Sequence, residues 1–282
     1  MKTLIHATTL IAAFTCITTL AMEQSITYHK ATQPDAKHIL HVINEHGIED
    51  RDKIVILPEN FREGAVNQAI LNSRLYCARQ GLDNVVAFKK LFIIKDIVEF
   101  NDITENEIRC HGQNSNFIDA RIIDPISKKI SCLSDKEALS FTRTNSVVIY
   151  FGGDYTIPSH RNRKINSHLT NYAFEKIKDD TIAAIQKNNL RQIVLLYGLT
   201  KANAGETIGG IDRTPSIVKA FTQFVSAIAT QCSFNTNIPL HLSRYEAFMP
   251  TFDPQSTECK PLPDNQAISG YGNVIVFPLF NQ

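Results

Sequence analysis

The sequence predicts an α/β fold in which helices cover both faces of a central sheet. Segments with strand-like and helix-like patterns alternate along the chain, and this alternation is typical of the class. Apolar residues make up 43% of the 282 residues, with only 12 glycines and 11 prolines, so the chain is neither disordered nor fibrous. A single hydrophobic core can extend over roughly 250 residues. We expect one domain over residues 22–282, with a C-terminal extension from about residue 230 whose role is not assigned.

Strands are predicted where β-branched and aromatic residues cluster between turn residues. The clearest cases are residues 146–150 (SVVIY) and 192–197 (QIVLLY). The first of these continues to residue 157 and ends at Pro158. The other predicted strands are 26–28, 53–57, 84–94, 240–245 and 274–279. Residues 101–145 are polar, with only short apolar runs, and give no comparably clear pattern.

Helices are predicted where apolar residues recur every three or four positions. Asp35 opens the first helix and Gly47 stops it, while Gly81 follows the second as a C-terminal stop. Cys77, in the second helical pattern, is expected to be a small buried residue. The predicted helices are 35–47, 61–79, a long amphipathic one across 169–185, and 217–228.

The first 21 residues are expected to be a secretory signal rather than part of the fold. Lys2 gives a positive start, an uncharged and mostly apolar run follows over residues 4–20, and Ala21 is a small residue at the cleavage point. A membrane anchor is the competing interpretation. However, five threonines dilute a run that already falls short of the ~20 apolar residues a spanning helix needs. We therefore expect an exported or secreted chain without a stable membrane span, which would meet another cytosol by entering a host cell.

Charge and residue spacing exclude several classes of function. The chain carries 29 Lys and Arg against 28 Asp and Glu, so it is neither a polybasic nucleic-acid binder nor an acidic tail. No Cys-x-x-Cys spacing occurs, and no metal is predicted. His38, His41 and Glu45 share a helix face, but they do not form a His-Glu-x-x-His pattern, and a solvated face explains them.

The most specific stretch runs over residues 154–177, where a strand ends at a proline, a basic loop follows and a helix begins. The first-turn amides of a helix have no partner within the helix, and the helix dipole adds partial positive charge there. Arg161, Arg163 and Lys164 bring three formal charges to the same point. This stretch predicts an anion site that suits a pyrophosphate.

Residues 157–169, Ile-Pro-Ser-His-Arg-Asn-Arg-Lys-Ile-Asn-Ser-His-Leu, resemble the acetyl-CoA loop of the GNAT superfamily of N-acetyltransferases. That loop reads Arg or Gln, two variable residues, Gly, one variable residue, then Gly or Ala. The preceding strand, the Pro, the Arg, the Ile and the Leu of its longer form all match in place. Residues 28–35 resemble the family's opening segment, and Asn203-Ala204 is similar to its Asn-containing turn, so the outline covers about residues 26–228.

Two departures from the family pattern accompany this resemblance. Lys164 and Asn166 stand where the loop has its glycines. Glycine there lets the backbone approach the phosphates without a Cβ in the way. The lysine either adds charge to the pocket or fills it. The family's closing Tyr-x-x-x-Gly-Phe pattern is not evident.

The resemblance implies a GNAT-like mixed central sheet and an N-acyltransferase with acetyl-CoA as its co-substrate. An amine, on a small molecule or a protein, would attack the thioester directly, with a base taking its proton and an acid protecting the leaving thiolate. The strand before the loop would pair with the pantetheine arm, and the loop amides would hold the pyrophosphate. The implied cofactor-binding residues are Tyr155, Thr156, Ile157, Arg161, Asn162, Arg163, Lys164, Ile165, Asn166 and Asn203.

The mechanism also requires a catalytic base and a catalytic acid. Asp154 is the carboxylate nearest the strand end and is the candidate base, with a turn residue after Gly152-Gly153 as the alternative interpretation. Tyr197 or Tyr245 is the candidate acid. A function of another class also stays open, an exported non-catalytic binding protein that keeps a GNAT-like fold. The lost glycines and the predicted export favour it, because CoA thioesters are kept inside cells.

Overall fold

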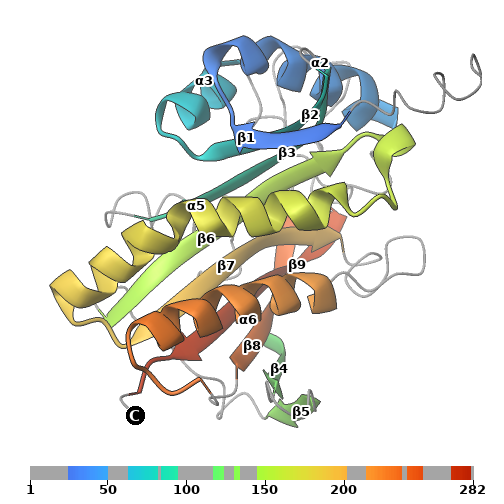
Figure 1. Ribbon diagram of the computed structural model, residues 1–282. Helices are drawn as coiled ribbons and strands as arrows, with labels where there is room; N and C mark the ends of the chain where they lie inside the picture. The colour runs from blue at the N-terminus through green and yellow to red at the C-terminus, as the bar shows by residue number, and fades with distance from the viewer. Residues whose placement is uncertain are drawn as a thin grey trace, which may run out of the picture.

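The computed structural model describes residues 25–49, 63–81, 84–94, 117–123, 130–133, 145–201, 214–236, 240–249 and 268–280. All the described strands join one nine-stranded sheet in the order β1-β2-β3-β6-β7-β9-β8-β4-β5 (Figure 1). The strands are β1 (Ile26–Lys30), β2 (Leu75–Gln80), β3 (Asn84–Ile93), β4 (Phe117–Ile123), β5 (Ile130–Leu133), β6 (Ser146–Thr156), β7 (Gln192–Lys201), β8 (Leu240–Met249) and β9 (Ile268–Pro278). The helices are α2 (Gln33–Glu49), α3 (Glu63–Leu71), α5 (Ile165–Asn188), α6 (Thr214–Gln231) and the short 3-10 helix η6 (Pro158–His160).

The sheet is mixed because one of its described pairs is parallel. β6 and β7 run side by side in the same direction, joined by η6 and α5, while the other described pairs are antiparallel. In Figure 1, α5 lies across the viewer's side of β6, and α6 lies beside α5 on the same side of the sheet, in front of β9. Successive side chains of β3 from Val85 to Phe88 are all buried, so both faces of the sheet are covered there. The predicted α/β class with helices on both faces is confirmed.

Aromatic packing holds α5 and α6 together on one side of the sheet. The Phe174 ring of α5 stacks on Phe224 of α6 with centroids 4.8 Å apart, and Phe221 lies 6.1 Å from Phe174. All three rings are buried, and Phe221 is fully buried. Since α5 begins at the basic loop, this cluster fixes the position of that loop relative to the sheet.

The start of α2 is fixed by a capping box. The Asp35 carboxylate accepts hydrogen bonds from the backbone N–H of Thr32 at 2.7 Å and from its hydroxyl at 2.8 Å. It also accepts one from Nε of Arg79 on β2 at 2.7 Å. Burial alone would raise the pKa of Asp35, but the bonds from His29, Thr32 and Arg79 hold it well below its usual range. Asp35 therefore ties the first helix to the sheet.

The predicted helix over residues 61–79 is wrong in its second half. α3 ends at Leu71, Ser73 takes a left-handed turn with φ 55°, and Leu75–Gln80 form β2. The first four residues of β2 are buried, and an apolar run buried on both sides cannot be told from a buried helix by periodicity alone. Cys77 is buried as expected, but in a strand.

The other elements agree with the sequence more closely. α2 starts two residues before Asp35 and ends two residues after Gly47. β1, β3, β6, β7, β8 and β9 all appear where strands were predicted. β1, β7 and β8 extend past the predicted ends, β9 starts earlier, and β3 and β6 each end one residue before the predicted end. The segment from residue 230 that was set apart as an extension supplies β8 and β9, and β9 pairs with β7. That segment is therefore part of the central sheet.

Some predictions lie outside the described residues. The predicted strand at 53–57 and the predicted signal at 1–21 are among them, so both stay predictions. β4 and β5 were not predicted, because the polar region that holds them gave no clear pattern. Among the described helices, none combines the length and apolar character needed to cross a membrane.

Candidate functional site

The two parallel strands stop pairing before they end. The pairs run from Ser146 with Gln192 to Phe151 with Tyr197. β6 continues to Thr156 and β7 to Lys201, and these described parts form no pairs with each other. β6 and β7 therefore separate beyond Phe151, and an extended ligand could pair with strand edges of this kind.

Two glycines allow β6 to bend at this point. The register with β3 shifts between Lys89 and Lys90, opposite Gly153, which has φ 32°. A Cβ on Gly152 would lie 2.1 Å from the Tyr150 ring, and that ring is itself buried. The bend thus depends on the absence of a side chain at Gly152.

The basic loop follows the end of β6 directly. Arg161 folds back over the strand end, where its Nε donates to the Thr156 carbonyl oxygen at 3.1 Å. Its guanidinium lies 5.5 Å from the centroid of the Tyr155 ring. Arg163 and Lys164 are exposed at the turn into α5. Positive charge therefore surrounds the start of the helix on the side where β6 leaves β7.

Two residues of the basic loop have the left-handed backbone conformation that usually favours glycine. Lys164, the N-cap of α5, is left-handed with φ 59° and ψ 10° and makes no side-chain capping bond. Asn162 is left-handed as well, with φ 64°. The left-handed region favours glycine, so Lys164 has the backbone conformation that a glycine at this position would adopt without strain. The first-turn amides of α5 have no cap from this side chain, which suits an anion.

Replacing Lys164 with glycine is expected to raise the free energy of unfolding by about 0.5–1 kcal/mol, because glycine adopts this φ without strain. Lys178→Gly, in the regular part of α5, is the matched control and is expected to lose about 1 kcal/mol. Urea denaturation of both variants measures the difference. A loss of stability in Lys164→Gly as large as in the control would contradict the left-handed assignment.

Asp154 lies between the sheet and the helix. Its Oδ2 accepts from Nζ of Lys89 on β3 at 3.0 Å and from Nδ2 of Asn166 on α5 at 2.7 Å. Lys89 is fully buried, and its Nζ also lies 4.0 Å from the centroid of the Phe151 ring. Asn166 therefore anchors the helix start to β6. These contacts favour a positioning role for Asp154 over the base that the sequence suggested.

His160 joins the loop to β2. Its Nε2 donates to Oε1 of Gln80 at 2.8 Å, and its Nδ1 accepts from the Ser159 hydroxyl at 3.0 Å. This assignment follows from the chemistry, because an amide oxygen only accepts. Burial, with a smaller effect of the nearby Arg163 charge, lowers the pKa of His160. The neutral ring therefore holds η6 against the sheet near pH 7.

The structure brings together only part of the predicted site. Two pairs of predicted residues are in contact: Asp154 with Asn166, and Arg161 with the Thr156 carbonyl. The side chains of Tyr155, Ile157 and Ile165 point into the core, so a ligand would meet their main chain. Asn203 lies outside the described residues, and for Tyr197 and Tyr245 only the strand positions are described. Their predicted roles stay predictions.

Lys89 and His160 were missed by the sequence analysis. A lysine inside an otherwise apolar strand (NVVAFKKLFI) was the one available signal for Lys89. His160 gave none, because its partner Gln80 is eighty residues away.

One cluster of the described residues has the composition of a metal site. Cys77 Sγ lies 3.1 Å from His29 Nε2, which is 3.4 Å from Oδ1 of Asp35. However, the Asp35 oxygens already accept from Thr32 and Arg79. Burial, together with the charge of Asp35, raises the pKa of the Cys77 thiol well above its usual range. The contacts of this cluster support a link between β1, α2 and β2 rather than a metal centre. On the first helix, Nδ1 of His41 lies 3.2 Å from Oε1 of Glu45 and both side chains are exposed, in keeping with a solvated face.

No protein-family model and no curated protein matches the chain. Solved structures that are similar include NAA60 of Arabidopsis thaliana in complex with acetyl-CoA, at 12% identity and a TM-score of 0.38, covering 92% of this chain and 100% of the other. Another is a GNAT-family acetyltransferase of Staphylococcus aureus MU50, at 10% identity and a TM-score of 0.32, covering 88% and 98%. A third is the ribosomal-protein-S5-alanine acetyltransferase of Vibrio fischeri, at 7% identity and a TM-score of 0.36, covering 90% and 92%. Because these TM-scores are below 0.5, the function proposed below rests on the geometry of the chain itself.

Proposed function

We propose that the chain is an acetyl-CoA-dependent N-acetyltransferase of the GNAT type. One observation carries the proposal: the parallel strands β6 and β7 stop pairing just before a basic loop in which Lys164 keeps the left-handed conformation of the family's glycine. An extended arm and an anionic group joined to it would fit this combination. Acetyl-CoA offers both, as pantetheine and pyrophosphate.

The binding roles follow from the placement of each residue. The main chain of β6 before Thr156 pairs with the pantetheine arm, and the open amides at the start of α5 receive the pyrophosphate. Arg163 and Lys164 supply charge from the exposed side of the loop. Arg161 holds the end of β6 through the Thr156 carbonyl rather than reaching outward.

The reaction is a transfer of the acetyl group from sulfur to nitrogen. The amine nitrogen forms a bond to the acetyl carbon while the bond from that carbon to sulfur breaks. The amine loses one proton to a base, and the CoA thiolate gains one from an acid. Asp154 is held by Lys89 and Asn166, so its part is to fix the helix start, and Tyr197 and Tyr245 remain the proposed acids. The acceptor is an amine on a small molecule or a protein.

Calorimetric titration of the chain from Met22 onward with acetyl-CoA and with free CoA tests the proposal. We expect saturable binding in the micromolar range, or about −8 kcal/mol. Arg163→Ala combined with Lys164→Ala is expected to weaken it at least tenfold, since hydrogen bonds to charged groups contribute about 1.5–3 kcal/mol each. Lys178→Ala with Lys187→Ala removes the same charge from α5 away from the loop and serves as the control.

Two results would count against the proposal. Absence of heat with protein near a millimolar would overturn it and would favour the non-catalytic alternative. Equal weakening in the loop variant and in the control would show that binding follows net charge and not the loop.

A further inference from the structure

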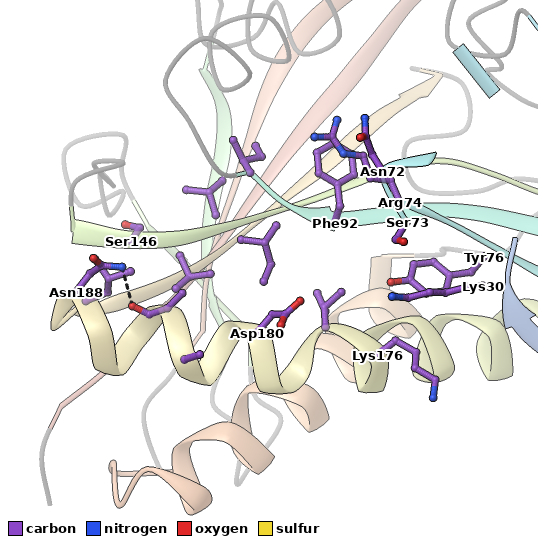
Figure 2. A pocket seen from close by; sticks show the side chains of 18 of the residues that line it. Lys30, Asn72, Ser73, Arg74, Tyr76, Phe92, Ser146, Lys176, Asp180 and Asn188 are labelled. Atoms are coloured by element: carbon purple, nitrogen blue, oxygen red, sulfur yellow. Dashed lines mark hydrogen bonds between the residues drawn. The ribbon is translucent and has the colours of Figure 1, made fainter. Parts of the chain in front are cut away.

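A cavity lies at the other end of α5 from the basic loop. Its volume is about 1100 Å³, and it lies between the second half of α5, the end of β3, the start of β6 and the turn from α3 into β2 (Figure 2). From Ile165 to Asp180 the helix advances roughly 20 Å. The cavity is therefore separate from the proposed CoA site, and its use does not depend on that proposal.

Tyr76 gives this cavity a polar group that lacks a partner. The side chain is fully buried, and its hydroxyl has no hydrogen-bond partner among the described residues. In Figure 2 the hydroxyl points from β2 toward the other lining side chains. Burial, together with the nearby Tyr172 and Asp180, raises the pKa of Tyr76 to about 12, so the group stays an O–H. A buried hydroxyl without a partner is costly, and a ligand group would remove the cost.

Charges of both signs line the cavity near this hydroxyl. Asp180 of α5 turns its carboxylate toward the cavity in Figure 2, and Lys30, at the end of β1, lies beside Tyr76. Asn72 adds an amide from the turn before β2. Lys176 points away in the same view, with its Nζ 5.1 Å from the centroid of the Tyr172 ring.

The rest of the lining is mostly apolar. The guanidinium of Arg74 lies over the ring of Phe92, which is part of this lining, at 4.3 Å from the ring centroid. The apolar lining includes Phe92, Ile94, Val148, Ile177, Ala184 and Leu190. A cavity of this kind takes a small molecule with an apolar body and few charged groups.

We propose that this cavity binds a small zwitterion of the amino-acid class with an apolar side chain. The ammonium group donates to the Asp180 carboxylate. The ligand carboxylate accepts from the Tyr76 hydroxyl and from Lys30, which Figure 2 shows side by side, and the side chain lies on Phe92 and the aliphatic residues behind it. Each charged end of the ligand thus meets an opposite charge, which a simple acid or a simple amine would meet at one end only.

Calorimetric titration of the full chain with L-phenylalanine, L-phenylalaninamide and 3-phenylpropanoate tests this assignment. We expect saturable binding of phenylalanine, and at least tenfold weaker binding of each analogue, because each lacks one charged end. Asp180→Asn is expected to weaken phenylalanine binding about tenfold. Asp179→Asn, an exposed neighbour outside the cavity lining, is the matched control and is expected to bind as the unmodified chain does.

Tyr76→Phe separates the ligand role from a structural one. The variant is expected to bind phenylalanine several-fold more weakly and yet to be as stable as the parent or more so, since it removes an unpartnered hydroxyl. Loss of stability together with unchanged binding would overturn the assignment. So would absence of saturation at 10 mM phenylalanine, or equal binding of 3-phenylpropanoate and phenylalanine.

Discussion

Replacing Asp154 with alanine is expected to lower the free energy of unfolding by about 3 kcal/mol. The substitution removes the carboxylate that faces the fully buried Lys89, and breaking such a pair from one side costs about 3–5 kcal/mol. The Asp154 side chain is 24% exposed, so we take the lower end of that range. The substitution also removes the hydrogen bond from Asn166 to Asp154, which joins the start of α5 to β6. Urea denaturation followed by circular dichroism measures the change.

Two further variants make this result interpretable. Asp179→Ala removes an exposed carboxylate from the middle of α5 and is expected to change stability by less than about 0.5 kcal/mol. Asp154→Ala combined with Lys89→Met replaces both charges and is expected to recover part of the loss. If the double variant is less stable than Asp154→Ala alone, the pair does not act as a buried ion pair.

Phe221→Ala is expected to cost about 3–5 kcal/mol, the range for removing a large buried ring. Phe221 is fully buried between α5 and α6, and its loss leaves Phe174 without one of its two aromatic neighbours. Phe280→Ala is the matched control, because the Phe280 side chain is 58% exposed. Thermal or chemical denaturation distinguishes the two, and a cost below about 1 kcal/mol for Phe221→Ala would contradict its place in the core.

Acetyl-CoA binding gives the Phe221 variant a second measurement. Because the cluster holds α5 against its neighbour, weakening it is expected to loosen the helix start as well. Binding measured where the variant is still folded should therefore decrease, while Phe280→Ala leaves it unchanged. Loss of stability with full binding would show that the loop is held by its own contacts alone.

The sequence indicated those parts of the fold that depend on local pattern. The runs at 146–150 and 192–197 are rich in β-branched and other apolar residues, so they could be assigned as strands without knowing their neighbours. Residues 146–150 and 193–196 are buried. β2 could not be assigned in this way, because its short apolar run at 75–78 follows α3 after only three polar residues, and a run buried on both sides fits a helix or a strand. The fold class could be predicted because it depends on the local patterns of the clear strands and helices and not on the assignment of β2.

The candidate site divides in the same way. The positive charge at 161–164 is visible in the sequence, and it lies at the start of α5 as expected. The partner of Asp154 was not visible, because Lys89 is 65 residues away and the two meet only through the register of β3 with β6. The direction of Arg161 was not visible either, since its bond to Thr156 depends on how the loop turns.

The left-handed lysine at the start of α5 bears on how proteins of this kind are found. A search that requires glycine at that position passes over this chain, since the residue there is Lys164. A search by backbone dihedral angles would find it, because Lys164 has φ 59°. A loop conformation that favours glycine can therefore be formed with another residue at the left-handed position. Other loops of this shape should then be sought by conformation rather than by letter.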